Sequence, residues 1–87
     1  MNYPFDEEDD NIEDERVLDL EMLREDLMAE LQAINQYQEH IDILDNEEAI
    51  DVLEHILGDE KEHVAELFKL IQKLDPVQAE KFNKNLL

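Results

Sequence analysis

The fold is decided by residues 20–44, which read LEMLREDLMAELQAINQYQEHIDIL. Along this stretch, mostly apolar residues recur at alternating steps of three and four. This spacing is typical of one helix facing another helix. It predicts a helix that begins between Glu15 and Leu20, with Asp19 as candidate N-cap, and ends at about Leu44. The members of this first seam are Leu20, Leu23, Leu27, Glu30, Ile34, Tyr37, Ile41 and Leu44.

A second seam follows a short break at Asp45-Asn46. Asp45 and Glu48, three residues apart, have the pattern of a capping box and predict the start of a second helix. A connection this short makes the two helices antiparallel neighbours. The second helix should continue to Leu74, although Gly58 weakens it by about 1 kcal/mol relative to alanine. The members of the second seam are Leu53, Ile56, Glu60, His63, Leu67, Leu70 and Leu74.

The sequence Asp75-Pro76-Val77-Gln78 predicts the end of the second helix and the start of a third, which runs to about Asn85. Asp75 suits the N-cap, Pro76 suits the first helical position, and Gln78 completes a capping box. We therefore expect an all-α fold: an antiparallel two-helix hairpin plus a short C-terminal helix.

A further apolar line on the second helix cannot be covered by one hairpin. Exposed apolar faces on a short hairpin favour self-association, most simply a two-fold dimer that forms a four-helix bundle. This expectation does not depend on any metal. The line consists of Ile50, Leu57, Val64, Phe68 and Ile71.

The chain carries 26 acidic and 7 basic residues, for a formal net charge of −19. Such a field repels nucleic acid and anionic membranes and attracts cations. Residues 6–15, DEEDDNIEDE, hold eight carboxylates that repel one another. We therefore expect a disordered acidic tail at residues 1–16 and a single domain at residues 17–87. The absence of cysteine excludes disulfides and thiolate metal sites, and without a signal peptide or membrane-length apolar run we expect a cytoplasmic protein.

Each seam is apolar except near its middle, where Glu30 interrupts the first and Glu60 with His63 interrupts the second. A carboxylate removed from water without a partner costs several kcal/mol. Glu60 and His63 form an E-x-x-H, whose spacing places both side chains on one helix face. Glu30 lies about 15 residues before the turn and Glu60 about 15 after it, so at roughly 1.5 Å per residue they share one level of the hairpin. A bound cation is the most economical explanation.

One chain thus supplies one glutamate and one E-x-x-H, which is half of the ligand set of di-iron carboxylate bundles. A two-fold dimer would complete the set, with two carboxylates free to bridge a metal pair. Oxygen-rich ligation with a minority of imidazole suits iron or manganese, and zinc is a common substitute.

Residues 30–37, ELQAINQY, and residues 59–64, DEKEHV, together with the LDP junction at 74–76, resemble the encapsulated ferritins. These are two-helix relatives of ferritin and rubrerythrin that are carried as cargo of encapsulin compartments. The resemblance covers roughly residues 20–85. It implies a ferritin-like half-bundle whose dimers assemble into a ring-shaped decamer, with di-iron centres between two chains. It also implies oxidation of Fe(II) to Fe(III), with the encapsulin shell storing the mineral.

By the same resemblance, Glu30, Glu60 and His63 are the ferroxidase ligands, and Tyr37 lies beside the metal site and serves catalysis. Members of the family can carry acidic residues one position before and two positions after the ligand glutamate, where they form an outer site for incoming metal. Ala29 and Gln32 stand at those positions, so no such site is expected there.

Two further features depart from the family. Gln36 replaces a tryptophan found beside the tyrosine in some members. The sequence ends at residues 85–87 without an evident shell-targeting tail, so either it is truncated or the protein is not encapsulated by that route. The remaining titratable candidates are weaker: His40 and His55 are expected to be partly exposed, and Glu39, Glu62 and Glu66 to be solvated.

Two alternatives remain open. A rubrerythrin-like peroxidase would use the same ligands, but the chain lacks the cysteine set of a built-in electron donor. A non-enzymatic helical adaptor could instead use its buried glutamate and histidine to set helix register, as a buried polar residue does in coiled coils.

Overall fold

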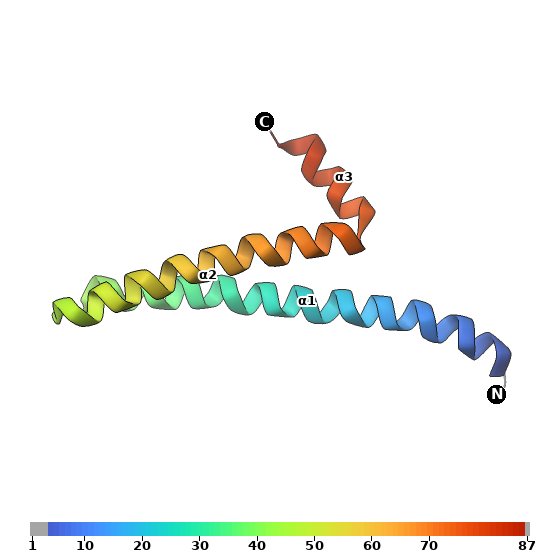
Figure 1. The fold of residues 1–87 in the computed structure, drawn as a ribbon, viewed down its shortest axis with the longest axis horizontal. Coiled ribbons are helices and arrows are strands. Elements are labelled where there is room, and N and C mark those ends of the chain that lie inside the picture. Colours follow the sequence, from blue (N-terminus) through green and yellow to red (C-terminus); the bar gives the residue numbers. More distant parts are fainter. Residues whose placement is uncertain (1–3, 87) are drawn as a thin grey trace.

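The computed structural model describes residues 4–86, which form three helices and no strand (Figure 1). Helix α1 spans Pro4–Ile43, α2 spans Glu47–Leu74 and α3 spans Pro76–Asn85. Within this range, α1 lies antiparallel against α2, and α3 turns away from the end of α2 (Figure 1). The expected all-α hairpin with a short C-terminal helix is confirmed. Side chains are described at Glu15 and from Val17 to Leu86.

Helix α1 begins well before its expected start, and Asp19 lies inside it instead of capping it. The acidic run contains neither glycine nor proline, and Pro4, which precedes it, stands in the first turn, where a helix tolerates it. The seam therefore marks where α1 meets α2 and not where the helix starts. Residues 1–3 lie outside the described range, and the division into a tail at 1–16 and a domain at 17–87 stays a prediction.

The turn of the hairpin is capped one residue later than expected. Asn46 is the N-cap of α2, and its side chain accepts a hydrogen bond from the Ala49 backbone N–H at 2.7 Å. The predicted capping box from Asp45 to Glu48 is therefore wrong, because Asn46 is an equally good cap and already satisfies the free N–H of the first turn. Glu48 still lies in that first turn, where its charge favours the helix dipole.

Asp75 forms the elbow between α2 and α3. Its side chain accepts a hydrogen bond from the Gln78 backbone N–H at 3.2 Å, and Pro76 follows at the start of α3, so the predicted N-cap is confirmed. The Asp75 backbone N–H donates to the Ile71 carbonyl at 2.8 Å. That N–H is therefore already engaged by the last turn of α2 and is not used by a reciprocal capping box.

The buried stripe of α2 shares Leu53, Glu60 and Leu67 with the predicted seam but is rotated from it. Every residue of the first seam is half-buried, and all but Leu44, which follows the last residue of α1, lie on that helix. The only buried side chains in the described part of the chain are those of Leu57 and Ile71, both on α2, which are 7% and 3% exposed. His63 and Leu70 lie at the exposed edge of the interface. The stripe of α2 that is buried or half-buried also alternates steps of four and three, and it consists of Leu53, Leu57, Glu60, Val64, Leu67 and Ile71.

A single copy is thin and extended, with principal extents of 62 × 35 × 14 Å. Its Cα radius of gyration is 18.7 Å, whereas a compact domain of this length has about 12 Å. Large apolar side chains such as Met28, Leu31 and Val52 remain exposed. These features agree with self-association, and the four-helix bundle formed by two copies stays a prediction. No described helix is both long enough and apolar enough to cross a membrane.

Candidate metal centre

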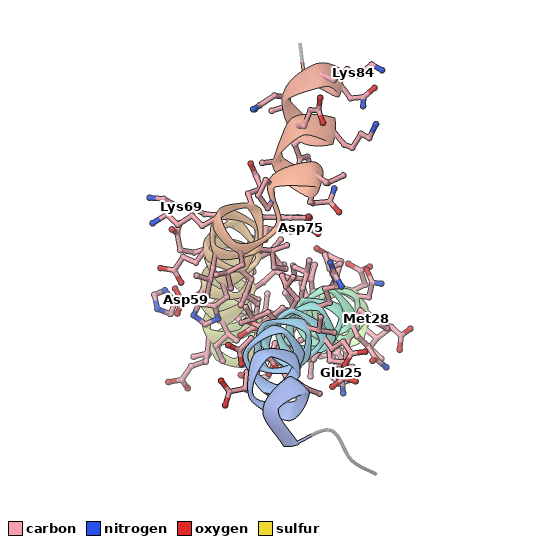
Figure 2. The ribbon with its side chains drawn as sticks, turned by 90° about the vertical axis from the view of Figure 1, so that its right-hand side faces the viewer. Glu25, Met28, Asp59, Lys69, Asp75 and Lys84 are labelled. Atoms are coloured by element: carbon pink, nitrogen blue, oxygen red, sulfur yellow. The ribbon has the colours of Figure 1, made fainter. Side chains whose placement is uncertain are left out.

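The structure brings together the three polar residues that interrupt the seams. Glu30 comes from α1, and Glu60 and His63 come from adjacent turns of α2. One ligand atom from each lies within 4.8 Å of the other two. Figure 2 looks along the hairpin and shows side chains of α1 and α2 filling the space between the two helices. The predicted shared level of Glu30 and Glu60 is thus confirmed by the geometry.

One imidazole nitrogen faces both carboxylates. His63 Nδ1 lies 2.8 Å from Glu30 Oε2 and 3.6 Å from Glu60 Oε1. The side chains of Glu60 and Glu30 are 15% and 23% exposed, whereas that of His63 is 47% exposed. The group is therefore shielded toward the helix interface and open toward one side of the hairpin.

Glu60 and His63 hold their protons more tightly than isolated groups would, because both pKa values are raised. The pKa of Glu60 is raised above 4.5, first by a hydrogen bond with Glu30, then by burial and by the negative charge of Glu30, while His63 acts in the opposite direction. Burial acts to lower the pKa of His63. The hydrogen bond to Glu30 and the neighbouring carboxylate charges outweigh this effect and raise that pKa above 6.5. A cation placed among these groups would replace the positive charge that protons now supply.

A groove of about 450 Å³ runs beside the group, between α1 and α2. Its walls include Ala29, Leu67 and Leu70, and two acidic side chains that sequence reasoning did not place there, Asp26 and Glu66. Both are exposed, as expected for Glu66, yet both face the site. The signal was present in the spacing, because Asp26 is four residues before Glu30 and Glu66 is three after His63.

The other candidates lie apart from the three ligating groups. Tyr37 is half-buried on α1, seven residues beyond Glu30, which corresponds to a rise of about 10 Å along the helix. His55 is exposed and lies 3.5 Å from Asp59 of its own helix. His40 is half-buried, and Glu39 and Glu62 are exposed, as expected.

The donor set fits a divalent cation. The set of two carboxylates and one imidazole is anionic and rich in oxygen, with a single nitrogen ligand. Such a set suits iron or manganese and also accepts zinc. Three protein ligands leave coordination positions free for a second metal, water or an oxidant. The chain's chemistry and geometry therefore favour a metal centre over a pair of buried polar residues that only sets helix register.

Comparison with known proteins identifies the family of the chain. The chain spans less than half the length of the two curated relatives that follow. It is 49% identical over 57 residues to encapsulin nanocompartment cargo protein EncC of Myxococcus xanthus (strain DK1622), which covers 66% of this chain and 44% of that protein. It is 33% identical over 66 residues to cargo protein EncB of the same organism, which covers 76% of this chain and 42% of that protein. No solved structure matches the chain. Residues 5–87 match the profile of the EncFtn-like family, and the chain therefore belongs to that family.

Proposed function

We propose that this protein is a ferroxidase that oxidises Fe(II) to Fe(III) at a di-iron site formed between two copies of the chain. The observation that carries the proposal is the convergence of Glu30, Glu60 and His63 from two antiparallel helices, with ligand atoms within 4.8 Å. Membership of the EncFtn-like family supports it.

The two-copy site follows from ligand number and from shape. Di-iron carboxylate bundles use a glutamate from each of two helices and an E-x-x-H from each of two others, and one chain provides half of this set. His63 is half-exposed at the open side of a hairpin only 14 Å thick. A second hairpin placed on that side would add the missing ligands and cover the exposed Leu70 at the same edge. We propose that Tyr37 lies near the completed site and serves catalysis there.

The reaction moves one electron from each of two Fe(II) ions to an oxidant. With dioxygen, two Fe(II), one O₂ and two protons give two Fe(III) and hydrogen peroxide; with peroxide as oxidant, the same electrons and protons give two waters. The contribution of the chain is to hold the two substrate ions at a fixed separation and to balance their charge with carboxylates. Iron binding needs these ligands deprotonated, and the raised pKa values of Glu60 and His63 make protons competitors of iron at the site.

An encapsulin shell is the proposed partner, because the two matched relatives are named as encapsulin nanocompartment cargo proteins. In this proposal, the chain works as a homo-oligomer inside a cytoplasmic compartment, and its dimers assemble into a decamer. The shell would retain the ferric mineral, and the cargo would supply the oxidation.

Anaerobic titration with Fe(II), followed by exposure to air, tests the proposal. We expect uptake to saturate at one Fe(II) per chain, followed by ferric absorbance at the same stoichiometry, and the Glu30→Ala variant to lose both. The absence of stoichiometric uptake by the wild-type chain would favour the helical adaptor. Uptake with oxidation by peroxide but not by dioxygen would favour the rubrerythrin-like peroxidase.

A further inference from the structure

The charge of the chain is divided sharply between its two parts. Residues 1–60 contain 22 acidic residues and two arginines, for a net charge of −20, whereas residues 61–87 contain five lysines and four acidic residues, for a net charge of +1. The proposed iron site explains only two of the carboxylates. It does not explain why the lysines gather at the other end of the sequence.

Two of the lysines, Lys69 and Lys73, lie at an apolar groove at the elbow between α2 and α3. The groove has a volume of about 540 Å³, and its apolar wall contains Phe68, Phe82 and Leu86, with Lys69 and Lys73 at its rim. Phe68 and Phe82 meet edge to face, with ring centroids 5.1 Å apart, and fix α3 against α2. Leu86 is 66% exposed. The groove is thus preformed and leaves apolar surface open.

The lysines of this region are not held in ion pairs: among the side chains that the structure describes, no ion pair uses a lysine. Asp75, the acidic residue of the elbow, is already paired with Arg24. Lys81 and Lys84 add two further positive charges on α3, and Figure 2 shows the Lys69 and Lys84 side chains extending outward from α2 and α3. The groove therefore suits a ligand that is both anionic and apolar.

The chain itself contains a segment of that chemistry at the start of α1. Residues 4–18, here called the acidic arm, hold the eight carboxylates of DEEDDNIEDE, with the apolar residues Phe5 and Ile12 among them. Asp19, Met22 and Leu74 line one depression, so the helix residues before Asp19 extend beyond the last turn of α2 (Figure 1). In the described structure, α1 makes no contact with α3. The arm of one chain therefore points away from its own groove.

We propose that the groove at the α2–α3 elbow binds the acidic arm of a second copy of this chain. The carboxylates of the arm would face Lys69 and Lys73, and its apolar residues would cover the surface left open at Leu86. The exchange can be reciprocal between two copies, each with its arm in the other's groove, or it can continue from copy to copy and build a ring or an open chain. The contact involves no ligand of the iron site and stands independently of the proposed ferroxidase activity.

Cross-linking between isotopically distinct copies tests the occupant directly. Full chains labelled with ¹⁴N and ¹⁵N are mixed, allowed to exchange, and joined by a zero-length carbodiimide that links carboxylates to lysines. We expect mass spectrometry to find residues 6–15 linked to Lys69 or Lys73, with the two peptides carrying different isotopes. Links confined to one isotope would mean that the groove holds its own arm, and this would overturn the proposal. Equal linking of the arm to Lys61, which lies on α2 outside the groove, would also overturn it.

A charge-reversal pair tests specificity. A fluorescent peptide of residues 4–18 should bind the full chain, and Lys69→Glu with Lys73→Glu should weaken binding at least 10-fold, whereas Lys61→Glu should not. A peptide with Asp6, Glu7, Asp9 and Asp10 replaced by lysine should recover binding to the doubly reversed chain. Circular dichroism checks that each variant keeps its helices. Equal binding by both variants would mean that the arm recognises another surface, or only net charge, and the proposal would fail.

Discussion

Arg24 and Asp75, 51 residues apart in the sequence, form an ion pair in which Arg24 Nη2 donates to Asp75 Oδ2 at 2.8 Å. The other oxygen of the same carboxylate accepts the Gln78 backbone N–H that begins α3. One side chain therefore caps α3 and also ties the elbow to α1. The direction of α3, and with it the shape of the groove at the elbow, depends on this residue.

Substitutions at Asp75 should separate these two roles. Asp75→Asn keeps a good N-cap but loses the ion pair, and since exposed ion pairs contribute about 0–1 kcal/mol, we expect a small loss in the free energy of unfolding. Asp75→Ala loses both interactions and should cost about 1 kcal/mol more. Urea unfolding at a fixed protein concentration measures the difference. Arg24→Gln is the matched control and should resemble Asp75→Asn, and equal losses from both Asp75 variants would show that the cap contributes nothing.

Removing any one of the three proposed ligands should abolish iron binding at the site. In a two-fold site each substitution removes two ligands, so Glu30→Ala, Glu60→Ala and His63→Ala should each lower the Fe(II) oxidation rate at least 10-fold. Glu62→Ala is the control, because Glu62 is exposed and lies between two of the ligands in sequence. Anaerobic Fe(II) titration and oxygen consumption provide the two readouts. Similar losses from Glu62→Ala and Glu60→Ala would show that the proposal assigns the site to the wrong face of α2.

The level of the site could be predicted from the sequence, whereas the rotation of α2 could not. Counting residues to the turn places Glu30 opposite Glu60, because helical rise is nearly constant. However, α2 carries two apolar lines that are offset by one residue: one contains Ile56 and the other contains Leu57. Periodicity alone does not determine which of the two lines faces α1. Packing decides this, and it moves His63 to the edge of the interface.

Polar contacts between residues that are distant in the sequence could not be predicted either. The Arg24 and Asp75 pair has no periodic signal, since any of many acidic residues could have met that arginine. The start of α1 was predicted wrongly for a different reason. The seam shows where α1 packs against α2 and not where the helix begins, and no helix breaker after Pro4 ends the helix in the acidic run. The placement of Tyr37 relative to the proposed iron site depends on a second copy, which a single chain does not specify.

The stability of the metal-free protein should fall as the pH rises. The folded state raises the pKa of Glu60 above 4.5 and that of His63 above 6.5, so it binds both protons more tightly than the unfolded state. The stabilisation from each proton is complete below the ordinary pKa and is lost as the pH rises through the raised one. We expect the melting temperature to fall from about pH 5 through the neutral range.

Variants at the same groups test the cause of this pH dependence. Glu60→Gln and His63→Gln should each reduce the slope of melting temperature against pH, whereas Glu62→Gln, which removes a charge from the exposed face of the same helix, should leave it nearly unchanged. Metal should act in the opposite sense, because it binds the deprotonated groups, and its stabilising effect should grow as the pH rises. If the slope is identical in all three variants, the pH dependence comes from the overall net charge of −19 and not from these two groups.

Gly58 tests whether a second backbone packs closely against α2. A Cβ added at this position would meet no atom within 4 Å in the described chain. Gly58→Ala should therefore stabilise the helix by about 1 kcal/mol, measured by urea unfolding. Ala65→Gly, at another exposed position of α2, should lower stability by a similar amount. Destabilisation or altered assembly in Gly58→Ala would instead indicate that another copy approaches the helix at this point.

The last prediction concerns the fate of the oxidised iron. A storage ferritin keeps its mineral because four-helix subunits close into a hollow shell, whereas this chain is a hairpin 14 Å thick whose grooves, in its described part, open to solvent. We therefore expect rapid Fe(II) oxidation with poor retention of the ferric product when iron is supplied well beyond the stoichiometry of the site. After heavy loading, size-exclusion chromatography should recover little more iron with the protein than its sites can hold, and the rest should precipitate or elute with small molecules. The Glu30→Ala variant provides the background for oxidation without the site. Co-production with an encapsulin shell should move the retained iron into the shell fraction if the protein is its cargo. Hundreds of iron ions eluting with a soluble, shell-free assembly would show that the chain builds a storage cage by itself, and the proposed division of labour between cargo and shell would then be wrong.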